Sequence, residues 1–345
     1  MPDLGPGKLL IVPIFLPFQG CPHRCVYCDQ ETITSRKAEP IHPSTITGII
    51  EQAIRSPYFD SAENPEVAFY GGTFTRLPRE RMRELLEAVS PYLKNGILHS
   101  IRLSTRPDAL DEETLLLLKR WGVKTVELGA QSMDDDVLEA SQREHTAEDT
   151  FRSFRLLREQ GFKIGVQLMP GLPGDSREKF LATVDRVIEL RPDMVRLYPT
   201  VVIQGTELSH WYRRGAYKPW SLEKAVGVCS ESVLGFERSS IPVIRIGLMA
   251  SPSLTDGGQI VAGPWHEAFG HMVRSAVYHR RIESSLPLWG HVGRIRLIVH
   301  PKEIPLMRGF KNHGVRDVEV KTGAIVESVL PDASISRGHF RVETA

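Results

Sequence analysis

Cysteine is scarce in this chain, with four residues among 345, at positions 21, 25, 28 and 229. Disulfide-stapled scaffolds are small, secreted and rich in cysteine, so we expect no framework of that kind. An excess of charge of one sign is also lacking, because 43 Lys and Arg stand against 42 Asp and Glu. The net charge of +1 creates no overall field that would hold the protein on nucleic acid, so only a local basic patch could do so.

Long apolar runs are missing as well. No stretch approaches the ~20 apolar residues that span a bilayer, and the apolar run after Lys8 is too short for a signal peptide. We therefore expect a soluble, cytoplasmic protein. The composition, 41% hydrophobic and 25% charged, is ordinary for a globular protein. The length suits one large α/β domain with a small appendage, or two domains.

From residue 9 to about 240, short apolar segments alternate with longer amphipathic segments of helical period. The short segments are apolar or β-branched, as buried parallel strands are. Some helical segments begin with capping signals, such as Thr146–Asp149, which has the form of a capping box. The expected strands are 9–16, 67–70, 101–105, 125–128, 164–169 and 194–198, and the expected helices are 44–55, 79–93, 111–121, 146–160, 177–190 and 221–238.

Six strand–helix units in succession imply a parallel sheet with right-handed crossovers, either an open doubly wound sheet or a barrel. Polar and glycine residues lie at or near the strand ends, and they favour the barrel because its C-terminal strand ends converge on one site. We therefore expect residues 1–240 to form a partial (β/α)6 TIM-type barrel. The strand-end residues are Gly71-Gly72, Ser104-Thr105, Gln131-Ser132, Gln167 and Pro199-Thr200.

Residues 241–345 follow a different rhythm, and we expect them to form a small α+β C-terminal extension or a cap on the barrel. The predicted elements are strands 243–248 and 295–299, a helix around 264–281, and a hairpin of strands 315–320 and 325–330 around Thr322-Gly323.

Three of the four cysteines lie within the eight residues Cys21–Cys28, directly after the first predicted strand. The spacing Cys-x3-Cys-x2-Cys supplies three thiolates from one loop, and thiolates are the ligands of iron–sulfur clusters. A cubane held by three protein thiolates leaves one iron open to a small molecule. A structural zinc ion is the alternative, although zinc usually takes four ligands, commonly from paired CxxC motifs. Only one CxxC exists here, Cys229 is distant, and His23 sits awkwardly inside the loop.

The motif Cys21-x3-Cys25-x2-Cys28, with Tyr27 before the last cysteine, resembles the radical S-adenosylmethionine (SAM) superfamily. The resemblance implies a [4Fe–4S] cluster held by the three cysteines, with S-adenosyl-L-methionine bound at the open iron. Reductive cleavage of SAM would yield a 5′-deoxyadenosyl radical that abstracts hydrogen from the substrate. An external electron donor such as flavodoxin or ferredoxin is implied as well.

Downstream blocks extend the resemblance and imply the residues that contact SAM. Phe69–Thr75 resembles the family's glycine-rich strand end, where paired glycines let the backbone approach the SAM amino group. The blocks 126–132 and 143–146 look like a pair shared by Elongator protein 3 and the oxygen-independent coproporphyrinogen oxidases. Arg143 would bind the SAM carboxylate through its guanidinium fork, whereas outside this block it would be read as a solvated charge. The implied SAM contacts are Tyr27, Gly71, Gly72, Thr73, Ser104, Gln131, Arg143, Gln167 at the ribose and Leu172 at the adenine.

Within the superfamily, the segments Gly71–Pro78, Ser104–Asp108 and Pro199–Leu208 are more like Elongator protein 3 than like the coproporphyrinogen oxidases. One departure is in the C-terminal third. About 95 residues follow residue 250, whereas a typical domain has on the order of 150, and they contain no glycine-rich CoA loop. We therefore expect this chain to lack the acetyltransferase domain, and a basic N-terminal arm for tRNA is not evident either.

The resemblance leaves three hypotheses for the function. The first is modification of a tRNA or other RNA base, the second is a small-molecule or porphyrinogen-type oxidoreductase, and the third is a non-catalytic iron–sulfur protein. Basic residues in the C-terminal third suit RNA contact, although such charges usually form a solvated face. They are Arg280, Arg281, Arg294, Arg296, Lys302, Arg308 and Lys311.

Two remaining groups have ordinary explanations. His266 and His271 are five residues apart, not the four of a metal-binding helix pair, so with His279 they are expected to be surface or core residues. Cys229 lies in the middle of a predicted helix and is expected to be a small buried hydrophobe.

Overall fold

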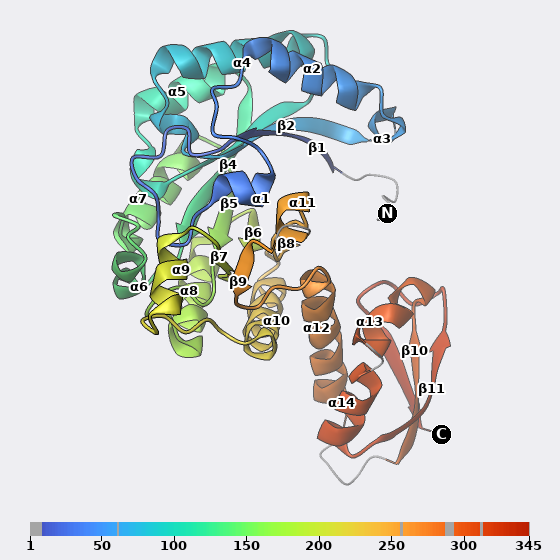
Figure 1. Cartoon of the computed structure of the whole chain (residues 1–345). Helices are drawn as coiled ribbons and strands as arrows, with labels where there is room; N and C mark the ends of the chain where they lie inside the picture. Colours follow the sequence, from blue (N-terminus) through green and yellow to red (C-terminus); the bar gives the residue numbers. More distant parts are fainter. Residues whose placement is uncertain (1–8, 61, 256–257, 287–292, 311–312, 345) are drawn as a thin grey trace.

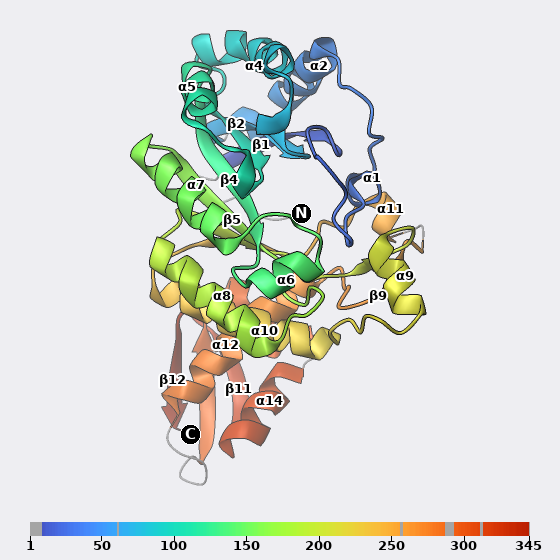
Figure 2. The same ribbon diagram turned by 90° about the vertical axis from the view of Figure 1, so that its left-hand side faces the viewer.

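The computed structural model describes residues 9–60, 62–255, 258–286, 293–310 and 313–344. Seven parallel strands form one curled sheet in the order β1-β2-β3-β4-β5-β6-β8, a half-barrel with its helices on the outer surface (Figures 1 and 2). The strands are β1 Leu9–Leu16, β2 Glu63–Gly71, β3 Ser100–Thr105, β4 Val123–Gln131, β5 Lys163–Leu168, β6 Met194–Leu197 and β8 Val243–Ile246.

Every crossover between neighbouring strands of this sheet contains at least one helix. Polar residues define where several helices begin, because their side chains accept hydrogen bonds from first-turn backbone amides. Thr146 and Asp149 form the capping box predicted from the sequence. The helices are α1 Gln30–Thr34, α2 Pro43–Ile54, α3 Pro57–Asp60, α4 Arg79–Lys94, α5 Glu112–Arg120, α6 Asp135–Ala140, α7 Ala147–Glu159, α8 Arg177–Leu190, α9 Glu207–Arg213 and α10 Leu222–Arg238.

The predicted partial barrel is confirmed, with one strand more than the sequence pattern indicates. The additional strand is β8, which pairs in parallel with β6 through Val195↔Val243 and Leu197↔Ile246. The sequence pattern groups these residues with the C-terminal extension, but they continue the sheet of the half-barrel. The division of the chain at residue 240 stays a prediction.

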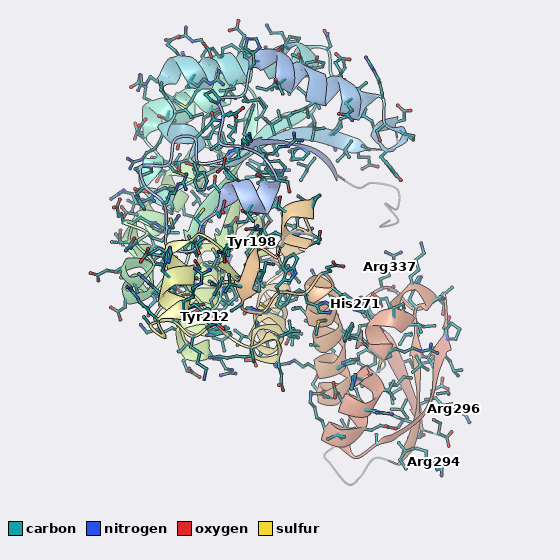
Figure 3. All side chains as sticks on the ribbon, in the orientation of Figure 1. Tyr198, Tyr212, His271, Arg294, Arg296 and Arg337 are labelled. Atoms are coloured by element: carbon teal, nitrogen blue, oxygen red, sulfur yellow. The ribbon has the colours of Figure 1, made fainter. Side chains whose placement is uncertain are left out.

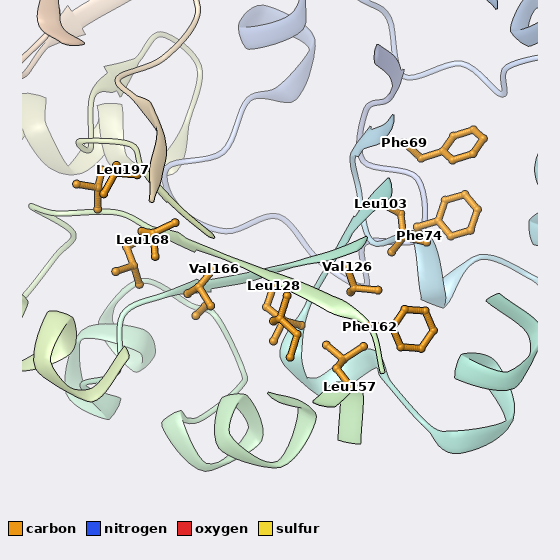
Figure 4. Packing of buried hydrophobic residues seen from close by; sticks show 14 of the residues in the cluster. Phe69, Phe74, Leu103, Val126, Leu128, Leu157, Phe162, Val166, Leu168 and Leu197 are labelled. Atoms are coloured by element: carbon orange, nitrogen blue, oxygen red, sulfur yellow. The ribbon is translucent and has the colours of Figure 1, made fainter. Parts of the chain in front are cut away.

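Side chains along the strands alternate between an apolar outer face and a polar inner face. Phe69, Leu103, Val126 and Leu128 belong to the outer face and pack in the main core (Figure 4). Strands buried on both sides normally read as continuous apolar runs. The inner face differs because it lines a cavity, and its polar residues include Glu66, Arg102, Glu127, Arg196 and Arg245.

The C-terminal part consists of helix α12, Phe269–Ser285, which packs against α10, and a small sheet in the order β11-β10-β12. The predicted hairpin is wrong in its first half, since residues 315–320 lie in helix α14. Gly314, Val318 and Thr322 are buried at a spacing of four, a helical period that the β-branched composition obscured. The elements are β10 Arg294–Val299, α13 Ile304–Arg308, α14 His313–Thr322, β11 Ile325–Pro331 and β12 Phe340–Thr344.

Three short elements lie between β6 and α12. Strands β7, Val202–Ile203, and β9, Ile260–Ala262, pair in antiparallel fashion, and helix α11 spans Pro252–Thr255. Among the described residues, no helix has both the length and the apolar character needed to cross a membrane.

Candidate active site

The half-barrel encloses a cavity of about 440 Å³, which lies at the C-terminal ends of its strands. This volume is in the range of small-molecule and cofactor sites. All seven strands contribute lining residues, from Phe15 on β1 to Arg245 on β8. The site therefore lies where the strand-end residues of the sequence pattern predict it.

The three cysteines of the loop between β1 and α1 all line this cavity, and none forms a disulfide. Burial raises the pKa of the Cys28 thiol most, and the nearby charges of Cys25 and Cys21 raise this pKa further. Within the described part of the chain, no three His, Cys, Asp or Glu side chains converge as ligands of one metal ion. A cubane cluster differs from a single ion because each thiolate binds a different iron. Three thiols along one cavity wall therefore fit a [4Fe–4S] cluster.

The glycines at the end of β2 hold the cysteine loop in place. A Cβ on Gly72 would lie 1.9 Å from the carbonyl oxygen of Gln19, and one on Gly20 would lie 2.1 Å from that of Thr73. The Thr73 amide donates to the Gln19 carbonyl at 2.8 Å, and Cys21 Sγ lies 3.5 Å from Thr73 Oγ1. Gly71, Gly72 and Thr73 line the cavity, and they also position the loop that carries the cysteines.

Arg143 lies directly beside the cysteines. Its Nη1 donates to Cys25 Sγ at 3.3 Å and its Nη2 donates to the Gly129 carbonyl, while its buried Nε has no hydrogen-bond partner among the described residues. An unpaired buried donor at a cavity is available to an acceptor that a ligand brings. Next to it, burial lowers the pKa of His145 to about 3, and the positive charge of Arg143 adds to this effect.

Gln131 and Gln167 are brought together from neighbouring strands. Gln167 Nε2 donates to Gln131 Oε1 at 3.1 Å, and both side chains line the cavity. Gln131 has a φ of 67°, in the left-handed region that non-glycine residues rarely adopt. Such a conformation at the last residue of β4 is typical of functional sites.

The remaining predicted SAM contacts divide into two groups. Tyr27 and Ser104 line the cavity. Leu172 does not, since it is buried beneath the loop in a cluster that includes Cys25, Val26 and Tyr27. Apolar lining on this side of the cavity comes from Met169, Val201 and Ile203.

A network of buried charges lies on the inner face of the sheet, where Tyr70, Glu127 and Arg196 line the cavity, and the motifs of the sequence did not identify it. Glu127 accepts from Arg102 Nη1 at 2.8 Å and from Tyr70 Oη at 3.1 Å, and its other oxygen lies 2.5 Å from Arg196 Nε. Arg102 also binds Glu66 at 2.7 Å. The signal was present as charged residues at inner-face positions of otherwise apolar strands.

Arg106 is a second site residue that the motifs did not single out. It contacts the Asp108 carboxylate through Nε at 2.8 Å and through Nη2 at 3.1 Å. Its Nη1 lies 3.2 Å from His23 Nε2, and His23 Nδ1 lies 2.8 Å from the Glu144 carboxylate. Arg106 therefore connects the cysteine loop to the segment that carries Arg143.

The other candidates of the sequence lie outside this cavity. His279 is buried and contacts the Met307 carbonyl at 2.7 Å, and Cys229 is fully buried as expected. Arg294 and Arg296 lie on the small C-terminal sheet, on its side away from the half-barrel (Figure 3), and both contact Glu327. This pairing reduces the local positive charge expected for RNA contact.

Comparisons with known proteins agree with this geometry. A family model described as the Radical SAM superfamily matches residues 15–187, and one described as the Radical_SAM C-terminal domain matches residues 192–279. A tRNA uridine(34) acetyltransferase of Methanocaldococcus jannaschii is 28% identical over 262 residues, which cover 64% of this chain and 48% of the relative. Elongator complex protein 3 of Homo sapiens is 33% identical over 181 residues, 47% of this chain and 33% of the relative.

The solved structure of Methanocaldococcus infernus Elp3 with an N-terminal deletion has a similar fold. Its TM-score is 0.61 at 24% identity, and the alignment covers 80% of this chain and 64% of that chain. The chain spans about half the length of the first curated relatives it matches.

Proposed function

Because the chain belongs to the radical SAM superfamily, we propose that it is an enzyme that modifies a tRNA base, with uridine as the first candidate. The family establishes the enzyme class and its cofactors, a [4Fe–4S] cluster and SAM. The substrate is proposed because a relative named tRNA uridine(34) acetyltransferase matches over 64% of this chain. The observation that carries the proposal is the convergence of three cysteine thiols and Arg143 on one cavity.

The residues that line the cavity divide the work of holding the cofactors. Cys21, Cys25 and Cys28 would bind three irons of the cluster. The β2 end at Gly72 would receive the SAM amino group, and Arg143, with its unpaired Nε, would bind the SAM carboxylate. When bound, these cofactors supply a 5′-deoxyadenosyl radical after one-electron reduction.

The amide pair Gln131–Gln167 has donors and acceptors that suit the ribose hydroxyls of SAM. The apolar lining near Met169, Val201 and Ile203 would exclude water from the reacting groups. The role of this chain is therefore to orient SAM and to protect a reactive species, while the hard chemistry belongs to the cofactor.

A flipped base would enter from the open side of the half-barrel, between β1 and β8. Phe15 and Tyr70, with ring centroids 6.4 Å apart, and Tyr198 present aromatic surfaces to the cavity. Tyr198 follows β6 and lines the cavity together with Ile33 and Thr34 of α1. Bases removed from a stack are commonly held against aromatic side chains.

The proposal includes an external electron donor, such as a flavodoxin or a ferredoxin, and a cytoplasmic location. It also includes a division of the chain near residue 240 into a core and a C-terminal extension, with β8 continuing the sheet of the core. Helix α12, which packs on α10, would attach this extension to the half-barrel.

The proposal is tested with anaerobically reconstituted protein, dithionite and SAM, with and without tRNA from a strain that lacks the gene. We expect 5′-deoxyadenosine to form and a modified nucleoside to appear in the digested tRNA. The variant Cys21→Ala/Cys25→Ala/Cys28→Ala should produce neither, and binding of tRNA should weaken steeply with salt. A nucleoside profile identical in wild-type and deletion strains would contradict the tRNA substrate, although SAM cleavage would remain.

A further inference from the structure

The cavity extends beyond the residues expected to hold SAM. Those residues come from the cysteine loop, from the β2 to β5 strand ends and, for Arg143, from the loop between α6 and α7. The lining continues with Arg196 on β6, Tyr198 directly after it, and Arg245 on β8. Strand β8 is an edge of the sheet, so this part lies at the open side of the half-barrel. The space there is available to a substrate.

The inner face of the sheet carries more positive than negative side chains. Glu66 and Glu127 face Arg102 and Arg196, and these four groups form ion pairs with one another. Glu127 is fully engaged, because Arg102, Arg196 and Tyr70 all contact its carboxylate. Arg245 adds a third guanidinium without a third carboxylate.

The position of Arg245 concentrates this positive charge. Arg245 lies directly beside Arg196 in the β6–β8 register, so two guanidinium groups are neighbours on the inner face. Arg245 Nε donates to the Gly247 carbonyl at 3.1 Å, which fixes the direction of the side chain. Among the described residues no Asp or Glu forms an ion pair with Arg245, so its terminal nitrogens are available to a ligand.

Two other arginines line the cavity without an ion pair to a carboxylate among the described residues, and both lie elsewhere in it. Arg143 lies at the cysteines, where the SAM carboxylate is expected. Arg24 is exposed at the loop, 4.2 Å over the ring of Phe18. Neither lies on β6 or β8, so Arg245 is the arginine available to an anion at this edge of the cavity.

We infer that Arg245 binds an anionic group of the substrate, a phosphate or a carboxylate, at the β8 edge of the cavity. A guanidinium matches both anions through paired N–H donors. The rest of the substrate would lie against the aromatic and apolar wall of Phe15, Tyr70 and Tyr198. This inference rests on the proposed function only in that the substrate reacts in the same cavity; it does not require an RNA.

The test measures equilibrium binding to reconstituted protein saturated with SAM, without a reductant. The probes are uridine 5′-monophosphate, orotate, uridine and inorganic phosphate. Charge-assisted hydrogen bonds predict that at least one anionic pyrimidine binds about tenfold or more tightly than uridine. A preference for uridine monophosphate and phosphate identifies a phosphate site, and a preference for orotate identifies a carboxylate site.

Variants assign the effect to Arg245. Arg245→Gln should remove the preference for the anion, Arg245→Lys should retain part of it, and Arg294→Gln on the distant small sheet should leave it intact. Iron content and melting temperature establish that each variant is folded. If Arg245→Gln does not fold, the affinities of Arg245→Lys decide the result. Equal affinity for neutral and anionic probes in the wild type, or a preference that survives in Arg245→Gln, overturns the inference.

The outcomes remain separate from those of the tRNA experiment. An Arg245-dependent anion preference with an unchanged tRNA profile supports a small anionic substrate and contradicts the tRNA proposal. A changed tRNA profile without any anion preference contradicts the role of Arg245 and leaves the tRNA proposal standing.

Discussion

Arg106 donates a hydrogen bond from Nη2 to the backbone carbonyl of Arg143 at 2.6 Å, with both residues buried. The same guanidinium also contacts Asp108 and lies 3.2 Å from His23 in the cysteine loop. One side chain therefore connects the loop that carries the cluster ligands to the residue expected to bind the SAM carboxylate. Burial of the Asp108 carboxyl raises its pKa, but the hydrogen bond and charge of Arg106 outweigh this and leave the pKa lowered.

Substitution of Arg106 by lysine should weaken SAM binding while the protein stays folded. Lysine keeps the charge but cannot contact Asp108, His23 and the Arg143 carbonyl together, because it lacks the planar fork. The loss of one or two charged hydrogen bonds predicts roughly tenfold weaker binding. Equilibrium binding of SAM without a reductant measures the effect, and Arg79→Lys at an exposed ion pair is the control. Equal affinity in Arg106→Lys and wild type would show that Arg106 does not position Arg143.

A methyl group at Gly72 should disrupt the cysteine loop. The Cβ of alanine would lie 1.9 Å from the Gln19 carbonyl oxygen, so the loop must move. We expect Gly72→Ala to incorporate far less iron on reconstitution, measured as iron per protein. The control is Gly48→Ala in helix α2, where no atom beyond the chain neighbours and the helix's own backbone lies within 4 Å of the new Cβ and alanine favours the helix by about 0.5–1 kcal/mol. Full iron content in Gly72→Ala would contradict the role of this contact.

The sequence alone predicted the half-barrel because its strands and helices depend on local signals, and the family resemblance named part of the cavity lining, including the three cysteines, Gln131 and Arg143. Short apolar segments indicated the strands, and helix caps indicated where helices begin. The spacing of the three cysteines and the paired glycines after β2 indicated the cluster and the cofactor site. Strand β8 was grouped wrongly, since its membership of the sheet depends on pairing with β6 rather than on any local pattern. Residues 315–320 were mistaken for a strand because their β-branched residues outweighed a helical spacing of buried positions.

The partners of side chains within the barrel were less accessible to sequence reasoning. Glu66, Arg102, Glu127 and Arg196 come from four strands, and the pairing and register of the strands in the sheet bring their charges together. Leu172 was predicted at the adenine from its turn, but packing turns it beneath the cysteine loop. Both cases depend on three-dimensional contacts between segments distant in the chain.

Neutralisation of Glu127 should destabilise the protein strongly. Its carboxylate contacts Arg102 and Arg196, and removal of the negative charge leaves Arg196 without its carboxylate partner and Arg102 with Glu66 alone. The loss of one partner of a buried ion pair costs about 3–5 kcal/mol. Glu127→Gln is therefore expected to lower the free energy of unfolding by about 3 kcal/mol or more in urea titrations.

A matched control for this substitution is Glu237→Gln. Glu237 also contacts two arginines, Arg274 at 2.7 Å and Arg281 at 2.6 Å, but its side chain is 27% exposed. Solvent screens this pair of contacts, so we expect a loss of about 1 kcal/mol or less. Equal losses in the two variants would show that burial of the inner network has no special energetic weight.

Asp175 should make stability depend on pH. Burial raises the pKa of its carboxyl to about 7, and the group lies in the turn after β5, where its Oδ2 accepts from the Gly171 amide at 2.8 Å. The folded state therefore retains a proton that the unfolded state, with a pKa near 3.8, releases. The stabilisation from this difference is complete below the unfolded pKa and is lost as the pH rises toward 7. Asp175→Asn keeps an acceptor but cannot ionise, so its melting temperature relative to wild type should increase from pH 5 to pH 8.

The control is Asp149→Asn in the capping box. There the hydrogen bonds with Thr146 outweigh burial and lower the pKa of the Asp149 carboxyl, so this variant should be less stable than wild type at pH 8. A constant difference between Asp175→Asn and wild type across this range would show that Asp175 ionises normally in the folded protein.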